Sequence, residues 1–153
     1  MLQSERVLKA AKVAYSLHDF GQQVAGGAQM AEALGVAPEL VLRTLVVAVK
    51  RGGREKRALV LQPSDAELDL KSFARAAGGE SARLAAREQA ESWTGLKLGG
   101  IGPLSVPKGR FEVWIARRAL GRERVFVSAG RPGVDLGLTP EDLAAASGAK
   151  AFP

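Results

Sequence analysis

The stretch Thr44–Gln62, TLVVAVKRGGREKRALVLQ, decides the fold class of this 153-residue chain. Two runs rich in valine and leucine, 44–50 and 58–62, flank a basic turn that contains Gly52 and Gly53, and this pattern predicts a β-hairpin. The run from Leu45 to Val49 is apolar without a break, which predicts a strand buried on both faces. The hairpin is therefore the first element of a predicted sheet.

Helix and strand patterns alternate irregularly in the rest of the chain. Helices are predicted over 4–11, 26–35, 38–44, 70–77, 81–93 and 139–148, and further strands over 14–20, 97–101, 111–116, 124–128 and 134–138. This order lacks the strict strand–helix alternation of a doubly wound sheet. We therefore expect one α/β domain over 1–153, with helices around a mixed, largely antiparallel sheet that is either open or closed as a barrel.

Several predicted helix ends carry local signals. Ser4, Ser81 and Thr139 are candidate N-caps, because their hydroxyls can accept a hydrogen bond from the first turn of a helix. Arg43 would close the 38–44 helix, where a cation suits the helix dipole. Arg87 and Glu91 are spaced for an i, i+4 ion pair.

Composition excludes several kinds of chemistry. The chain has no cysteine, which removes disulfides, thiolate nucleophiles and cysteine metal sites. A zinc site or a serine–histidine hydrolase would rest on His18 alone, and we expect this histidine to be structural, exposed or at a rim. No metal and no other cofactor is predicted. No apolar run approaches the roughly 18 residues of a membrane helix, and no signal peptide is evident, so we expect a cytoplasmic protein without membrane contact.

The formal net charge of +6 favours a polyanionic partner. Cations gather in two segments, 50–57 and 108–124. If they converge on one face they form a phosphate-binding surface, and otherwise they are solvated turns. The candidate contacts are Lys50, Arg51, Arg54, Lys108 and Arg110.

Glycine and proline recur in Thr94–Gly109, TGLKLGGIGPLSVPKG. The pattern predicts either a rigid loop whose peptide groups face a ligand or a tight bend in a barrel strand. It is not a Walker or dinucleotide-binding motif. A loop of peptide donors beside basic residues can bind an anionic or ester group and stabilise an oxyanion. Asp135 either orients a water or an amine there or points to solvent, and Ser128 and Thr44 can add hydroxyls.

Three blocks carry a resemblance to a known family: VLRTLVV (41–47), TGLKLGGIGP (94–103) and VSAGRPGVDLGLTPEDL (127–143). In this order and at these separations they are similar to the YbaK / prolyl-tRNA-synthetase-associated editing domain family, over residues 8–149. The resemblance implies a single α/β domain on a mixed-strand barrel. It implies hydrolysis, in trans, of the ester of a mischarged Cys- or Ala-tRNA(Pro), without a metal.

The resemblance also implies partners and leaves alternatives. The partner is tRNA, and an aminoacyl-tRNA synthetase is a further candidate. One alternative is a catalytically impaired module of the same fold that binds tRNA or a nucleotide without turnover. Another is hydrolysis of a different small ester or of another tRNA's aminoacyl group.

The family motifs assign roles to particular residues. Arg43 stands where lysine is usual, which keeps the charge but makes proton transfer by this side chain implausible. Serine is more frequent at Gly102, tyrosine occurs at Phe20, and glycine is frequent at Ala129. The implied catalytic residues are Arg43, Gly100, Gly102, Pro103 and Asp135. The implied substrate-binding residues are Phe20, Thr44, Gly99, Ile101 and Ser128.

Overall fold

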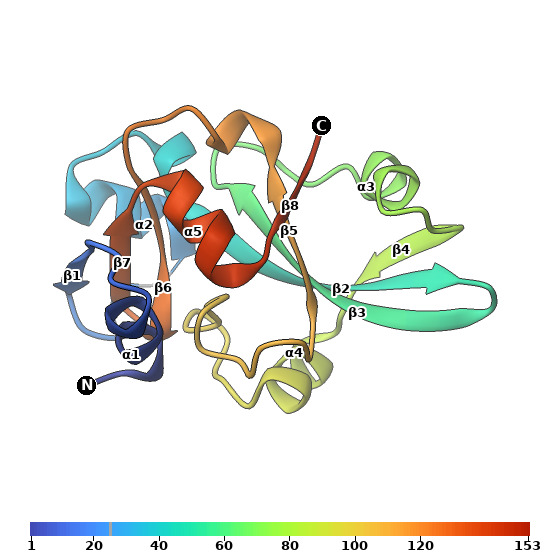
Figure 1. Ribbon diagram of the computed structural model, residues 1–153, viewed down its shortest axis with the longest axis horizontal. Helices are drawn as coiled ribbons and strands as arrows, with labels where there is room; N and C mark the ends of the chain where they lie inside the picture. The colour runs from blue at the N-terminus through green and yellow to red at the C-terminus, as the bar shows by residue number, and fades with distance from the viewer. Residues whose placement is uncertain (25) are drawn as a thin grey trace.

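The hairpin of strands β2 (Leu42–Arg51) and β3 (Arg54–Pro63) runs through the middle of the molecule in the computed structural model, which describes residues 1–24 and 26–153 (Figure 1). The two strands pair without interruption from Leu42 opposite Pro63 to Arg51 opposite Arg54. Side chains on both faces of the hairpin are buried, including Val47 and the adjacent Ala48. The predicted hairpin and its two-sided burial are confirmed.

A five-stranded sheet forms around this hairpin in the order β4-β2-β3-β5-β8. Strand β4 (Ser81–Leu84) pairs antiparallel with β2. On the other side β5 (Glu112–Ala116) pairs parallel with β3, and β8 (Lys150–Phe152) pairs parallel with β5. The sheet is therefore mixed, as predicted, although β8 was not among the predicted strands.

A second, antiparallel sheet has the order β1-β7-β6, with β1 (Ser16–Asp19), β7 (Val134–Leu138) and β6 (Val125–Arg131). One parallel bridge, Val41 with Phe126, connects it to the start of β2. The strands of the described residues thus form two open sheets. Of the two predicted options the open one is correct, and the closed barrel implied by the family resemblance does not form.

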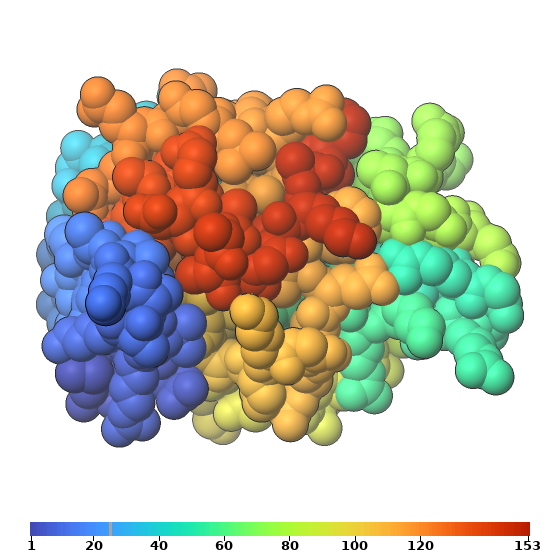
Figure 2. Space-filling model, in the orientation of Figure 1, coloured from blue at the N-terminus to red at the C-terminus, as the bar shows by residue number. Residues whose placement is uncertain are grey.

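Five α-helices cover the sheets in the described part of the chain: α1 (Gln3–Ala10), α2 (Gly26–Leu34), α3 (Leu70–Ala76), α4 (Arg87–Thr94) and α5 (Pro140–Ser147). Leu8 of α1 and Leu143 of α5 join the core on β6 and β7, and Phe73 of α3 joins the core on β2 and β3. The N-terminal segment and the hairpin tip lie at opposite ends of the molecule (Figure 2). Among the described residues, no helix has the length and apolar character that a bilayer-spanning segment needs.

Two predicted helices were wrong in position. The segment 38–44 contains only a 3₁₀ turn, Pro38–Leu40, before β2 begins at Leu42. Segment 81–93 begins as strand β4, and its helix starts only at Arg87. In both places strand pairing, of β2 with β3 and of β4 with β2, outweighs the helix propensity of leucine, arginine and alanine. Arg43 therefore lies on a strand, and Ser81 caps no helix.

Other local predictions had mixed outcomes. The predicted strand 97–101 is a loop. Ser4 lies inside α1, where its hydroxyl donates to the Ala129 carbonyl at 2.7 Å rather than capping the helix. Thr139 does cap α5 and accepts from the Asp142 amide at 3.1 Å. Arg87 and Glu91 approach to 3.9 Å, as the i, i+4 spacing predicted.

Candidate active site

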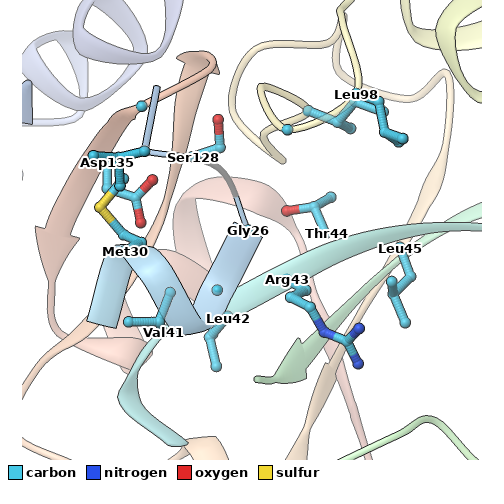
Figure 3. Close-up of a pocket in the computed structure, with 15 residues that line it drawn as sticks. Gly26, Met30, Val41, Leu42, Arg43, Thr44, Leu45, Leu98, Ser128 and Asp135 are labelled. Atoms are coloured by element: carbon cyan, nitrogen blue, oxygen red, sulfur yellow. The ribbon is translucent and has the colours of Figure 1, made fainter. Parts of the chain in front are cut away.

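A cavity of about 200 Å³ opens where strands β2 and β6 separate. Val41, the residue before β2, forms a parallel bridge with Phe126 of β6. Four segments line the cavity: the first half of α2, Val41 with the first four residues of β2, the loop 98–101, and the β6–β7 hairpin (Figure 3). Segments that are distant in sequence therefore meet at this one point.

Asp135 forms the polar end of the cavity. It lies on the central strand β7, directly opposite His18 of β1 and Ser128 of β6. Directly opposed residues of antiparallel strands project from the same face, so the three side chains form a row across the sheet. Asp135 is only 6% exposed, which overturns the solvent-facing alternative. Burial raises the pKa of its carboxyl to about 7, because the charged form loses hydration.

Thr44 faces Asp135 from the β2 wall. Its hydroxyl oxygen is buried and has no hydrogen-bond partner among the described residues. In Figure 3 this oxygen points toward the side of the cavity that holds Ser128 and Asp135. A buried hydroxyl without a partner costs free energy, so the geometry favours a ligand group that completes it.

Arg43 leaves the opposite face of β2, because neighbouring residues on a strand alternate. Its Nη2 donates to the Ala66 carbonyl at 3.1 Å, and the guanidinium points away from Asp135 (Figure 3). The Nε atom is buried without a partner among the described residues. Arg43 therefore lines the cavity with its stem, while its charge lies against the 64–67 loop.

Ser128 and His18 complete the row on the β1–β7–β6 sheet. The Ser128 hydroxyl accepts from the Gly130 amide at 3.1 Å. The His18 Nε2 lies 2.8 Å from the Ser16 hydroxyl, and its ring packs edge-on against Phe126. His18 is not among the cavity's lining residues in the described part of the chain, in keeping with the structural role expected for it.

The glycine-rich loop alternates between the cavity and the β6–β7 hairpin. Gly99 and Ile101 line the cavity. Gly100 and Gly102 face the hairpin: a Cβ at Gly100 would lie 2.6 Å from Pro132, and one at Gly102 would collide with the Ser128 carbonyl oxygen. The loop is thus neither a barrel bend nor a row of glycines all facing a ligand. A serine at position 102 would not fit without displacing this backbone.

The structure brings six of the ten predicted catalytic and substrate-binding residues to the cavity wall: Arg43, Thr44, Gly99, Ile101, Ser128 and Asp135. Four others lie elsewhere. Gly100 and Gly102 pack on the hairpin, and Pro103 lines a separate hollow between α1 and α5. Phe20 supports the wall from behind, where it packs beside Met30 and Val41 and its amide donates to the Gly133 carbonyl at 2.9 Å.

Sequence reasoning did not name the other lining residues of the cavity, among them the apolar wall residues Met30 and Val41. Both are buried and line the cavity. Each occupied an ordinary apolar position in a predicted helix, so their only signal was the packing of α2 over the start of β2.

The predicted tRNA contacts do not converge on the cavity. Lys50, Arg51 and Arg54 lie at the hairpin tip, and eight residues of extended chain separate Arg43 from Arg51, which is about 26 Å. Arg51 is held by Glu112 in a two-pronged ion pair at 2.5 and 2.7 Å. Lys108 and Arg110 are exposed in the loop before β5. These cations form separate groups along the molecule.

Comparison with known proteins identifies the family. The model of the aminoacyl-tRNA editing domain matches residues 22–146, a range that contains every segment of the cavity. This chain belongs to the aminoacyl-tRNA editing domain family. The match spans most of the chain and includes the wall residues of the cavity, so the editing-domain cavity is the candidate active site.

One relative by sequence and one solved structure are similar to this editing domain over most of their length. A protein of Enterococcus faecalis (strain ATCC 700802 / V583) named EbsC, proposed to be a Cys-tRNA(Pro)/Cys-tRNA(Cys) deacylase, is 29% identical over 140 residues, which is 90% of this chain and 83% of EbsC. The crystal structure of the hypothetical protein APE2540 superposes with a TM-score of 0.86 at 27% identity, over 97% of this chain and 96% of that one.

A third similar structure belongs to a protein proposed as a trans-editing enzyme for prolyl tRNA synthetase. Its TM-score is 0.79 at 23% identity, over 97% of this chain and 94% of that one. At this identity the likeness shows the fold alone.

Proposed function

We propose that this editing domain hydrolyses, in trans and in the cytoplasm, the ester bond of a mischarged aminoacyl-tRNA of the Ala-tRNA(Pro) or Cys-tRNA(Pro) type. The observation that carries the proposal is the buried Asp135 facing the unpartnered Thr44 hydroxyl across a small cavity within the described part of the chain. The name of the relative EbsC supports the same substrate class. A prolyl-tRNA synthetase is the proposed partner that supplies the mischarged tRNA.

The size and lining of the cavity support a small aminoacyl group. Met30, Val41 and Ile101 give it an apolar part, while Thr44 and Asp135 give it a polar part. About 200 Å³ suits a side chain such as that of alanine or cysteine beside an ester. Discrimination among such side chains rests on only about 1–3 kcal/mol per methylene, so these wall residues set the substrate range.

In the proposed reaction, Asp135 orients a water molecule and accepts its proton. The water oxygen attacks the ester carbonyl carbon, the carbon–oxygen bond to the terminal ribose breaks, and the ribose hydroxyl leaves with a proton. A carboxyl with a pKa near 7 suits this work, because it is partly ionised at neutral pH and still basic. A thiol or the ribose 2′-hydroxyl of the substrate is the other candidate for the nucleophile or base.

The Thr44 hydroxyl and the peptide N–H groups of Gly99 and Ile101, two loop residues that line the cavity, are the proposed donors to the developing oxyanion. Each well-placed donor contributes on the order of 10²-fold to such a reaction. We propose that Arg43 contributes its charge and transfers no proton, because a guanidinium stays protonated. Its guanidinium also donates a hydrogen bond to the Ala66 carbonyl.

The test compares the protein with Asp135→Asn on Ala-tRNA(Pro) and Cys-tRNA(Pro) between pH 5.5 and 8.5. We expect kcat/KM of the unchanged protein, after subtraction of the buffer rate, to rise with pH, reach half its maximum near pH 7 and level off above about pH 8. The Asp135→Asn variant should be slower and should lose this inflection. A variant with the same rate and the same profile would remove Asp135 from the mechanism.

One observation favours the alternative of a non-hydrolysing tRNA- or nucleotide-binding module. The Arg43 guanidinium is turned to the 64–67 loop and away from Asp135, at a position where the family resemblance implies lysine. Binding of tRNA without hydrolysis of any mischarged species would support this alternative.

A further inference from the structure

The rim of the cavity has an apolar projection that is fixed in place. Gly26, Leu98 and Gly99 are exposed although they line the cavity, so the opening lies between the start of α2 and this loop (Figure 3). The Leu98 side chain is 50% exposed. Its amide donates to the Glu91 carboxylate of α4 at 2.8 Å, and the Gly100 amide donates to the Lys97 carbonyl at 2.8 Å. The backbone on both sides of Leu98 is therefore held.

Two cations flank this projection. Lys97 directly precedes Leu98, and Arg131 is the last residue of β6, where the β6–β7 turn begins. A Cβ built on Gly100 would lie 2.8 Å from the Arg131 carbonyl carbon, so the loop and the turn are in backbone contact. Both side chains are exposed, and neither forms an ion pair with a carboxylate in the described part of the chain. Four other arginines are paired with carboxylates at 2.5 to 2.8 Å: Arg51, Arg83, Arg118 and Arg122.

We propose that Lys97, Leu98 and Arg131 form the docking surface for the 3′-terminal nucleotides of tRNA. The inference rests on the proposed function. An aminoacyl group inside the cavity leaves its ribose and base at the opening, beside Leu98. The leucine offers apolar area to a base face, and the two cations offer charge to the phosphates that follow. The hairpin tip, about 26 Å from Arg43 along β2, is too distant for the terminal nucleotide.

The experiment measures the affinity of the protein for two uncharged transcripts of one tRNA(Pro), one complete and one that lacks the 3′-terminal CCA. We expect the unchanged protein to bind the complete transcript about tenfold more tightly. Leu98→Ala should reduce this preference about fivefold, because alanine is too short to cover the face of the base. The double variant Lys97→Ala/Arg131→Ala should also reduce it. In a plot of log Kd against log salt concentration, the slope for the double variant should be smaller than that for the unchanged protein. The difference should be about 0.7 for each single-strand phosphate that the two cations neutralise.

Matched controls separate docking from general effects of charge and hydrophobicity. Leu84→Ala on β4, an edge strand of the five-stranded sheet, removes a leucine that is 51% exposed and does not line the cavity. Lys71→Ala/Arg75→Ala on α3 removes two exposed cations. Both controls should keep the preference for the complete transcript. Thermal unfolding of each variant checks that the fold is intact.

Three results would overturn the inference: equal affinity of the unchanged protein for the two transcripts, binding of neither transcript, or a preference that survives both rim variants. The readout does not depend on hydrolysis. A rim-dependent preference without deacylation would leave the docking surface standing and would contradict the proposed hydrolysis alone.

Discussion

At the scale of residues, the cavity is built around two buried polar groups, and the Thr44 hydroxyl has no hydrogen-bond partner in the described part of the fold. Asp135 is buried at the centre of β7, and Thr44 presents a buried hydroxyl from β2. Such groups reduce the free energy of unfolding unless something completes their hydrogen bonds. The change in the free energy of unfolding when such a group is removed can be measured. This change distinguishes a group that binds a ligand from one that supports packing.

Replacement of Thr44 by valine tests this directly, because valine has nearly the same shape and no hydroxyl. We expect Thr44→Val to leave the free energy of unfolding unchanged or to raise it by up to about 1 kcal/mol, since the unsatisfied group is removed. Deacylation should fall by a factor of about ten or more, and Thr44→Ser should restore most of it. Denaturant unfolding and initial rates provide the two readouts. A Thr44→Val protein that is less stable and equally active would make the hydroxyl a structural group.

The raised pKa of Asp135 predicts a pH-dependent stability. A carboxyl that titrates near pH 4 in the unfolded chain and near 7 in the folded one binds its proton more tightly when folded. Below about pH 4 the carboxyl is protonated in both states and does not lower the free energy of unfolding. As pH rises through 7, burial of the charged carboxylate lowers the free energy of unfolding by up to about 4 kcal/mol. We expect Asp135→Asn to be more stable than the unchanged protein at pH 8 and similar to it at pH 4.5. An equal difference at both pH values would mean that the carboxyl titrates normally.

Substitution of Arg43 by lysine tests whether position 43 contributes only its charge or also takes part in the chemistry. Arg43→Lys should leave the fold intact, because the guanidinium's hydrogen bond goes to a single loop carbonyl, that of Ala66. If position 43 needs only charge, kcat/KM of the variant should be lower than that of the unchanged protein or within about threefold of it. The ammonium keeps the charge but lacks the planar fork of the guanidinium. A clear rise in rate would show that an ammonium does chemistry that the guanidinium cannot.

At the scale of elements, the glycine-rich loop positions the cavity wall through its contact with the β6–β7 hairpin. Gly100 and Gly102 allow the two backbones to touch, and this contact turns Gly99 and Ile101 toward the cavity. Sequence alone identified this loop and its glycines, because glycine is required where backbones approach closely. It could not tell which glycines face the ligand, since that depends on a partner segment about 30 residues later in the chain.

Insertion of one methyl group at Gly102 should separate the loop from the hairpin. We expect Gly102→Ala to lower the free energy of unfolding by about 1–3 kcal/mol and to reduce deacylation strongly, because the displaced loop carries Gly99 and Ile101. Gly78→Ala is the control: its Cβ would meet nothing within 4 Å, but its φ of +72° is strained for alanine, which costs roughly 1–2 kcal/mol. This control should lose stability and keep its activity. Equal activity of both variants would show that the loop does not shape the site.

At the scale of the whole molecule, the sequence predicted the class of fold better than its connections. The hairpin was predictable because two runs rich in valine and leucine and a Gly-Gly turn act locally. The short strand β4 and the start of β2 were mistaken for helix, because their strand structure comes from pairing with residues far away in sequence. The cations at 50–57 were identified from sequence, but only the length of β2 shows how far they lie from the cavity.

The central claim is that the cavity hydrolyses small mischarged aminoacyl esters on tRNA. The most direct measurement is the deacylation rate of a panel of aminoacyl-tRNAs by the purified protein, relative to buffer. The panel includes Ala-tRNA(Pro), Cys-tRNA(Pro), Pro-tRNA(Pro) and species with larger side chains. We predict rapid hydrolysis of the alanyl or cysteinyl species and little of the prolyl and larger ones. No hydrolysis above the buffer rate for any member of the panel, with tRNA binding intact, would contradict the account.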